Sequence, residues 1–124
     1  MNIIENTITK PTYTETQAQL FKLLAHPVRL GILTLLRDGE HCVCHIEAHL
    51  GLRQSAISQQ LALLREAGLV QDRRDGWNIF YRVSDPALYV ILDSAAEFSG
   101  QTYEPLSNNE VHCCCPDCSS KSQN

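Results

Sequence analysis

The sequence lacks the segments that would attach the chain to a membrane or export it. No apolar run approaches the roughly 18 residues of a membrane span. The first residues, MNIIENTITKP, lack the basic stretch and apolar run of a signal peptide. We therefore expect no membrane partner and a location in the cytoplasm. Cysteines stay reduced there, which favours metal binding or redox chemistry over a disulfide framework.

An overall excess of positive charge is also missing, because 10 basic and 14 acidic residues give a formal net charge of −4. The imbalance is uneven along the chain. From Arg53 to Arg82, five arginines stand against three acidic residues, whereas the segment from Val83 to the end holds one lysine and six acidic residues. The total charge argues mildly against a nucleic-acid partner, but the local basic excess is compatible with a DNA-facing surface in the middle of the chain.

Hydrophobic periodicity predicts a mainly α fold with one β-hairpin. Four helices are expected to begin near Thr14, which has capping-box spacing with Gln17, and at Pro27, Cys42 and Gln54. Alternating residues flank Asp75-Gly76 as in a hairpin, with Ile79, Tyr81 and Val83 inward, and Asp85-Pro86 predicts the start of a last helix. This order is that of a winged helix-turn-helix domain over residues 14–100, between a flexible N-terminal arm (1–13) and a flexible, cysteine-rich tail (101–124).

The stretch QSAISQQLALLREAGL is expected to form the helix that reads DNA, with Ile57, Leu61 and Leu64 facing inward. Its polar residues near the N-terminal end suit contacts to base edges. These candidates are Gln54, Ser55, Ser58, Gln59 and Gln60. The hairpin adds Arg73, Arg74 and Trp77 as candidates for contacts to DNA. The alternatives are a plain solvated helix face and an ordinary polar turn.

The segment LAHPVRLGILTLLRDGEHCVCHIEAHLGLRQSAISQQLALLREAGLVQDRRDGWNIFYRVSDP resembles the ArsR/SmtB family of metal-responsive bacterial repressors. The resemblance extends over about residues 20 to 98, and EHCVCHI is similar to the metal-binding box of that family. It implies a homodimer that binds double-stranded operator DNA without the ion and releases it with the ion. It also implies dimer contacts through the first and last helices, here through Leu20, Phe21, Leu24, Leu88, Ile91, Leu92 and Ala95.

The usual partners of the two box cysteines, Cys42 and Cys44, are absent. Where the family often has a third cysteine the chain has Glu47, residues 1–41 contain no cysteine, and residues 86–98 contain no histidine. The tail motif HCCCPDC offers other donors, namely His112, Cys113, Cys114, Cys115 and Cys118. We expect the tail to complete the site, the alternative being a separate scavenging cluster. His41, His45 and His49 recur every four residues, which suits a zinc ligand pair or a solvated helix face.

The thiols favour a soft, thiophilic ion. Arsenite or antimonite fits the resemblance best, and cadmium, lead or zinc remain open. A thiol-based redox sensor on DNA is the alternative function. A thiol enzyme is not expected, because no βαβ unit accompanies the C-x-x-C motif of the tail.

In an intact helix Cys42 and Cys44 would lie on different faces, because i and i+2 positions diverge. Chelation of one ion by both thiols would then require the first helical turn to open. We therefore expect the ion and the intact helix to compete, and this competition to shift the DNA-reading helix.

Overall fold

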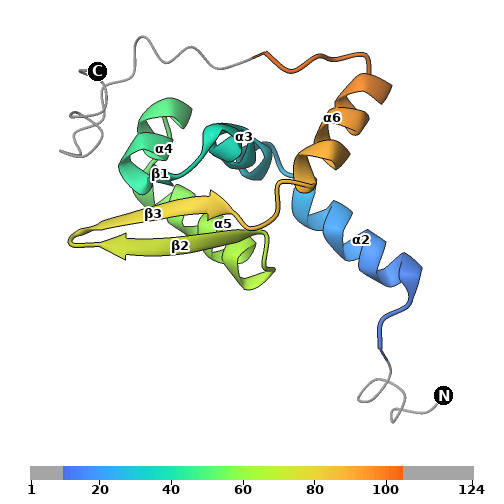
Figure 1. Ribbon diagram of the computed structural model, residues 1–124, viewed down its shortest axis with the longest axis horizontal. Coiled ribbons are helices and arrows are strands. Elements are labelled where there is room, and N and C mark those ends of the chain that lie inside the picture. Colours follow the sequence, from blue (N-terminus) through green and yellow to red (C-terminus); the bar gives the residue numbers. More distant parts are fainter. Residues whose placement is uncertain (1–9, 105–124) are drawn as a thin grey trace.

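The computed structural model describes residues 10–104 and confirms the winged helix-turn-helix fold (Figure 1). Within this part of the chain, helices precede and follow a small antiparallel sheet. The elements are α2 (Tyr13–Leu24), α3 (Pro27–Leu35), the 3-10 helix η1 (Leu36–Asp38), β1 (His41–Cys42), α4 (Val43–Leu50), α5 (Gln54–Glu66), β2 (Val70–Asp75), β3 (Asn78–Val83) and α6 (Leu88–Phe98).

The core lies where α3, α4 and α5 pack together. Ile57, Leu61 and Leu64 of α5 are completely buried, as their spacing predicts. They pack in one cluster with residues such as Ile32 of α3 and Ile46 of α4. Gly51 joins α4 to α5 with a φ of 64°, a left-handed conformation that favours glycine. This packing fixes α5 on the core by one face and leaves its other face at the surface.

The sheet has the order β1-β3-β2, so the hairpin carries a third, very short strand that periodicity did not predict. β1 pairs with β3 through Cys42 opposite Phe80 and His41 opposite Tyr81. Phe80 points away from the main core, as the alternation predicts, but it is only 4% exposed rather than open to solvent. The added strand covers Phe80 and gives the base of the wing a second apolar cluster of its own.

Several helix ends differ from the expected ones by one or two residues. Thr12, not Thr14, caps α2, in a capping box with Glu15, so helix begins inside the expected arm. α4 begins at Val43 rather than at Cys42, because Cys42 continues β1 in an extended conformation. α6 begins at Leu88. The two residues before it form a turn in which the Asp85 carboxylate accepts a hydrogen bond from the amide of Ala87.

The first residues of the expected tail contact the body of the protein. The guanidinium of Arg37 in η1 lies 4.3 Å from the ring centroid of Tyr103 and 4.6 Å from that of Tyr89. Arg37 also pairs with Asp93 of α6. The chain after α6 therefore returns towards the segment that leads into β1. His112 and the four tail cysteines lie outside the described residues.

Among the described residues, no single helix is long and apolar enough to cross a membrane. One sharply bent pair, α2 with the helix Pro27–Asp38, passes such a test of length and composition.

Candidate DNA-binding surface and thiol site

The exposed N-terminal part of α5 presents a group of small and amide side chains. Gln54, Ser55, Ser58 and Gln59 are all exposed, while the opposite side of the helix is buried. Arg53, the residue that precedes the helix, makes no capping hydrogen bond through its side chain. The first backbone amides of α5 are therefore not capped by that side chain, and helix N-termini favour anions such as phosphate. This end of α5 has the composition and the exposure of a surface that reads DNA.

Gln60 differs from the other four candidates on α5. It is half-buried, and its side-chain oxygen accepts a hydrogen bond of 2.8 Å from Nε of Arg29. Arg29 also donates to the backbone oxygen of Leu23. Gln60 thus ties α5 to the preceding helices, and a contact to a base would have to compete with this bond.

All three candidate residues of the wing are exposed. Trp77 is fully exposed in the hairpin turn, and Arg74 is exposed near the end of β2. Gly76 has a φ of 63°, which the tight turn requires and glycine permits. An exposed aromatic ring and a cation at a wing tip suit contacts with DNA backbone or minor groove.

Arg73, the third candidate, is held against the protein. Its guanidinium donates to both carboxylate oxygens of Glu40, with a shortest distance of 2.6 Å, and lies 4.7 Å from the ring centroid of Phe80. The hydrogen bond to Glu40 raises the pKa of Arg73 above its usual value. The sequence indicated no role for Glu40, since the two partners are 33 positions apart and only the short strand β1 brings them together.

The two box cysteines meet in one apolar cluster at the start of α4. Cys42 is 1% exposed and packs with Phe80, and the half-buried Cys44 packs against this pair. Both carry thiols. The expectation that the thiols diverge on two faces of one helix is therefore wrong. Cys42 lies before the helix in extended backbone, with φ −79° and ψ 161°. Cys42 thus stands outside the first turn of α4.

The three histidines line up beside the thiols, as their four-residue spacing predicts. The rings of His41 and His45 stack with centroids 4.5 Å apart, and His49 follows at the same distance with its ring tilted. Burial, followed by the charges of His41 and His49, lowers the pKa of His45 to about 4. Burial also lowers the pKa of His49. The imidazoles of His45 and His49 are therefore neutral at neutral pH.

Within residues 10–104, no group of three or more histidine, cysteine, aspartate or glutamate side chains is arranged to hold a metal ion. The two thiols, Cys42 and Cys44, are the predicted ligands that the described part of the chain brings into one cluster.

The predicted dimer residues fall into two groups. Leu24 and Leu88 are each 6% exposed in the core of the chain itself and are not available to a partner. Phe21, Ile91 and Ala95 are exposed, and Leu20 and Leu92 are half-buried. Sequence reasoning missed Val90 and Phe98 on α6, which are 67% and 94% exposed, although their large apolar side chains were a signal.

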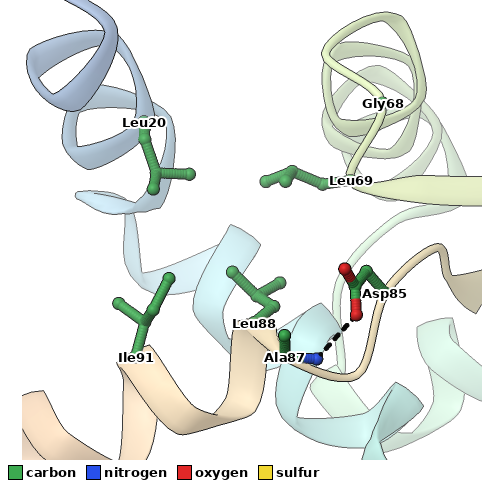
Figure 2. Close-up of a pocket in the computed structure, with 7 residues that line it drawn as sticks. All are labelled: Leu20, Gly68, Leu69, Asp85, Ala87, Leu88 and Ile91. Carbon is green, nitrogen blue, oxygen red and sulfur yellow. Dashed lines mark hydrogen bonds between the residues drawn. The ribbon is translucent and has the colours of Figure 1, made fainter. Parts of the chain in front are cut away.

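Leu20 and Ile91 also line an apolar pocket of about 220 Å³ between α2, α6 and the start of β2 (Figure 2). Leu69 and Leu88 contribute further apolar walls, and the Asp85 carboxylate lies at the edge, where it accepts the hydrogen bond of Ala87. Apolar surface thus extends over both end helices.

The chain is similar to characterised bacterial regulators over most of its length. The family described as "Bacterial regulatory protein, arsR family" matches residues 26–72. The arsenical resistance operon repressor of Escherichia coli is 41% identical over 86% of this chain and 92% of its own. The biofilm growth-associated repressor of Agrobacterium fabrum is 45% identical over 64% of this chain and 74% of its own.

Solved structures agree with these sequence matches. The structure described as reduced HlyU from Vibrio cholerae superimposes with a TM-score of 0.63 at 34% identity, over 71% of this chain and 93% of its own. The match to the E. coli repressor, at 41% identity over nearly the whole length of both chains, shows common family membership. The protein therefore belongs to the ArsR/SmtB family of winged helix-turn-helix transcriptional repressors.

Proposed function

We propose that the protein is a homodimeric repressor that binds operator DNA in its ion-free form and leaves it when a thiophilic ion binds Cys42 and Cys44. One observation carries this proposal, namely the meeting of both thiols in a single cluster at the base of the wing and at the start of α4. α4 is the first helix of the helix-turn-helix, so an ion bound there acts on the elements that face DNA. The protein is then a cytoplasmic regulator rather than an enzyme.

The proposed DNA interface consists of the N-terminal part of α5 and the tip of the wing. Ser58 and Gln59 are exposed where base edges of the major groove would lie, and Gln pairs well with adenine. Arg74 and Trp77 serve the adjacent backbone or minor groove. The unit that binds DNA and dimerises is the domain 14–100.

The proposed dimer forms through the exposed apolar residues of the end helices. Phe21 of α2 and Ile91 of α6 are exposed beside the half-buried Leu92. Apolar side chains gathered on one surface are typical of an interface between subunits. Two-fold symmetry would also place two α5 helices on successive turns of an operator.

The tail is proposed to supply the donors that the described residues lack. Cys113, Cys114 and Cys115 follow Tyr103 by about ten residues, and an extended chain of that length spans roughly 30 Å. Tyr103 lies against Arg37, which precedes Cys42 by five positions in the sequence, so the tail starts from a residue held by the segment that leads into β1. Cys118 belongs to the same candidate set, with His41, His45 and His112 as less favoured ligands.

Arsenite or antimonite is the favoured effector, because three thiolates suit these ions and an arsenical repressor is among the relatives. Cadmium, lead and zinc are the other candidates, and a homologue of the repressor SmtB is also a relative. The experiment that tests the function is release of an operator probe, titrated in parallel with arsenite, cadmium, lead and zinc under reducing conditions.

Four variants refine this titration, namely the two single cysteine variants, their combination and a truncated chain. Cys42→Ser and Cys44→Ser should each keep DNA binding and lose release, since a hydroxyl is a poor ligand for soft ions. Deletion of residues 112–124 should keep DNA binding and raise the ion concentration needed for release. Release by the double cysteine variant would refute the proposed thiol site, and an unshifted curve for the truncated chain would refute the role of the tail.

A second candidate function is a redox sensor that uses the same thiols. It is favoured by the packing of Cys42 next to Cys44 and by similarity to the structure described as reduced HlyU. Such a sensor would leave DNA on treatment with an oxidant such as hydrogen peroxide in the absence of ions. Release by ions under reducing conditions, without an effect of the oxidant, would exclude it.

A further inference from the structure

One row of four side chains crosses the outer face of the sheet. Three of them belong to β1, β3 and β2, and the fourth belongs to the residue directly before β1. Residues opposite one another in paired strands share a face, so Cys42, Phe80 and Arg73 point to the same side. Phe80 packs with Cys42 on one side and lies under the Arg73 guanidinium on the other. Glu40, two residues before Cys42, completes the row by accepting the hydrogen bonds of Arg73.

The ion pair between Glu40 and Arg73 therefore crosses β3 and fastens the segment before β1 to β2. We call this pair, together with the Phe80 ring beneath it, the staple. Tyr81, the neighbour of Phe80, faces the main core instead. The staple thus lies on the opposite face of the sheet from the main core, together with the buried thiol of Cys42.

An ion cannot reach Cys42 while this cluster is closed, because the residue is only 1% exposed. Metal–thiolate bonds are about 2.3 Å long for an ion such as zinc. An ion bound to both Cys42 and Cys44 would therefore occupy space beside the Phe80 ring and displace it. The Arg73 guanidinium lies over this ring, so displacement of the ring would disturb the ion pair between Glu40 and Arg73 of the wing.

We propose that the staple couples the thiol site to the wing, with Glu40 and Arg73 as positioning residues. The closed staple fixes the wing for DNA binding, and ion binding at Cys42 and Cys44 opens it and frees the wing. This inference rests on the proposed function and adds how ion binding at the thiols reaches the wing. It assigns to Arg73 a role in placing the wing rather than a contact to phosphate.

Glu40→Gln and Arg73→Gln each remove the charge pair and keep a polar side chain of similar size. The matched control is Asp72→Asn, which breaks another exposed ion pair of β2, that between Arg65 and Asp72 at 3.0 Å. The pair in the control lies in a different row, since Asp72 is opposite Tyr81. All variants are made in the full chain, and the double staple variant shows whether the two residues act as one unit.

The first readout is the fluorescence anisotropy of Trp77, the single tryptophan of the chain, in protein without DNA. Because Trp77 is fully exposed in the wing turn, its anisotropy reports on motion of the wing. Cadmium, added under reducing conditions and followed by its thiolate absorption, should lower the anisotropy of the parent protein and of the control. The staple variants should start at a lower value and change little.

The second readout is the ratio of operator dissociation constants with and without cadmium. Both staple variants should bind cadmium more tightly, by about two- to five-fold, which is the scale of a lost exposed ion pair. Their operator ratio should fall at least several-fold, and the double variant should equal the singles. The control should keep the ratio of the parent protein.

Parent-like anisotropy and operator ratio in both staple variants would overturn the inference and leave the proposed function standing. A parent protein that binds cadmium but keeps the operator would refute the proposed function, while its Trp77 signal still decides whether the staple opens. A parent protein without cadmium–thiolate absorption would overturn both. If the operator ratio fell in the control as well as in the staple variants, the loss of any ion pair of β2 would have the same effect. That result would also refute the staple.

Discussion

Replacing Arg74 with Gln should weaken the salt dependence of DNA binding, whereas the same change at Arg73 should leave that dependence nearly unaltered. The two arginines are neighbours on β2, and their sequence context treats them alike. Both are exposed, but the structure separates them, because Arg73 is bonded to Glu40 across the sheet. A guanidinium that already has a carboxylate partner releases few counterions when DNA arrives.

The size of the effect follows from counterion release. Each phosphate contact contributes about 0.9 to the slope of log K against log salt concentration. A dimer that loses Arg74 from both subunits should therefore lose about 1.8 from this slope. Between about 50 and 200 mM salt, such a change alters the ratio of affinities by about tenfold. Glu40→Gln should steepen the slope by up to about 0.9 per subunit, because it frees Arg73 to meet a phosphate.

The assay is anisotropy of a labelled operator and of a random duplex of equal length, over a series of sodium chloride concentrations. The Arg74 variant should show the shallower slope on both duplexes, since a phosphate contact carries no sequence information. Equal slopes for the two arginine variants would refute the distinction between them. Such a result would also show that Arg73 leaves Glu40 and contacts a phosphate when DNA binds.

Three further outcomes are expected. Because the pKa of His45 is about 4 when folded, below its unfolded value, the stability that it contributes is full above pH 6.5 and is lost as the pH falls towards 4. Discounted for the solvent exposure that remains to this half-buried imidazole, the loss is about 1–2 kcal/mol. Urea unfolding between pH 7 and 4.5 should show it, and His45→Gln should flatten it. Leu92→Glu should yield monomers or unfolded chains in sedimentation, and a parent protein that sediments as a monomer at micromolar concentration would contradict the dimer. Ser58→Ala and Gln59→Ala should each lower the affinity for the operator, by about 1–3 kcal/mol for a lost bidentate base contact and less for a single bond. Their affinity for random DNA should not change. Unchanged binding of the operator would show that α5 does not read bases.

The helices and the hairpin were predictable because local patterns determine them. Ile57, Leu61 and Leu64 recur at helical spacing and are all completely buried. Glycines mark the end of α4 and the hairpin turn, where a positive φ is needed. The exposed residues at the start of α5 were predictable for the same reason, since a helix with one apolar face leaves its opposite face to solvent.

The features that escaped prediction depend on contacts between distant segments. A strand of two residues has no period to detect, so neither β1 nor the burial of Phe80 beneath it was expected. The link from Glu40 to Arg73 requires that strand and was invisible for the same reason. Leu24 and Leu88 illustrate the converse case, because an apolar helix face does not reveal whether the chain itself or a second subunit covers it.

The one-residue spacing of Cys42 and Cys44 has a simpler physical basis than competition with a helix. In extended backbone, alternate residues share a side, so Glu40 and Cys42 lie on the face that carries Phe80. Val43 packs against the main core, and the residues on either side of it join the outer cluster. The chain thus enters α4 with one residue anchored in the core and two thiols directed away from it. A second residue inserted between the cysteines would direct Cys44 away from Cys42 or pull Val43 out of the core. Such an insertion should abolish release by the ion even though both thiols remain, and retained release would show that the spacing has no such role.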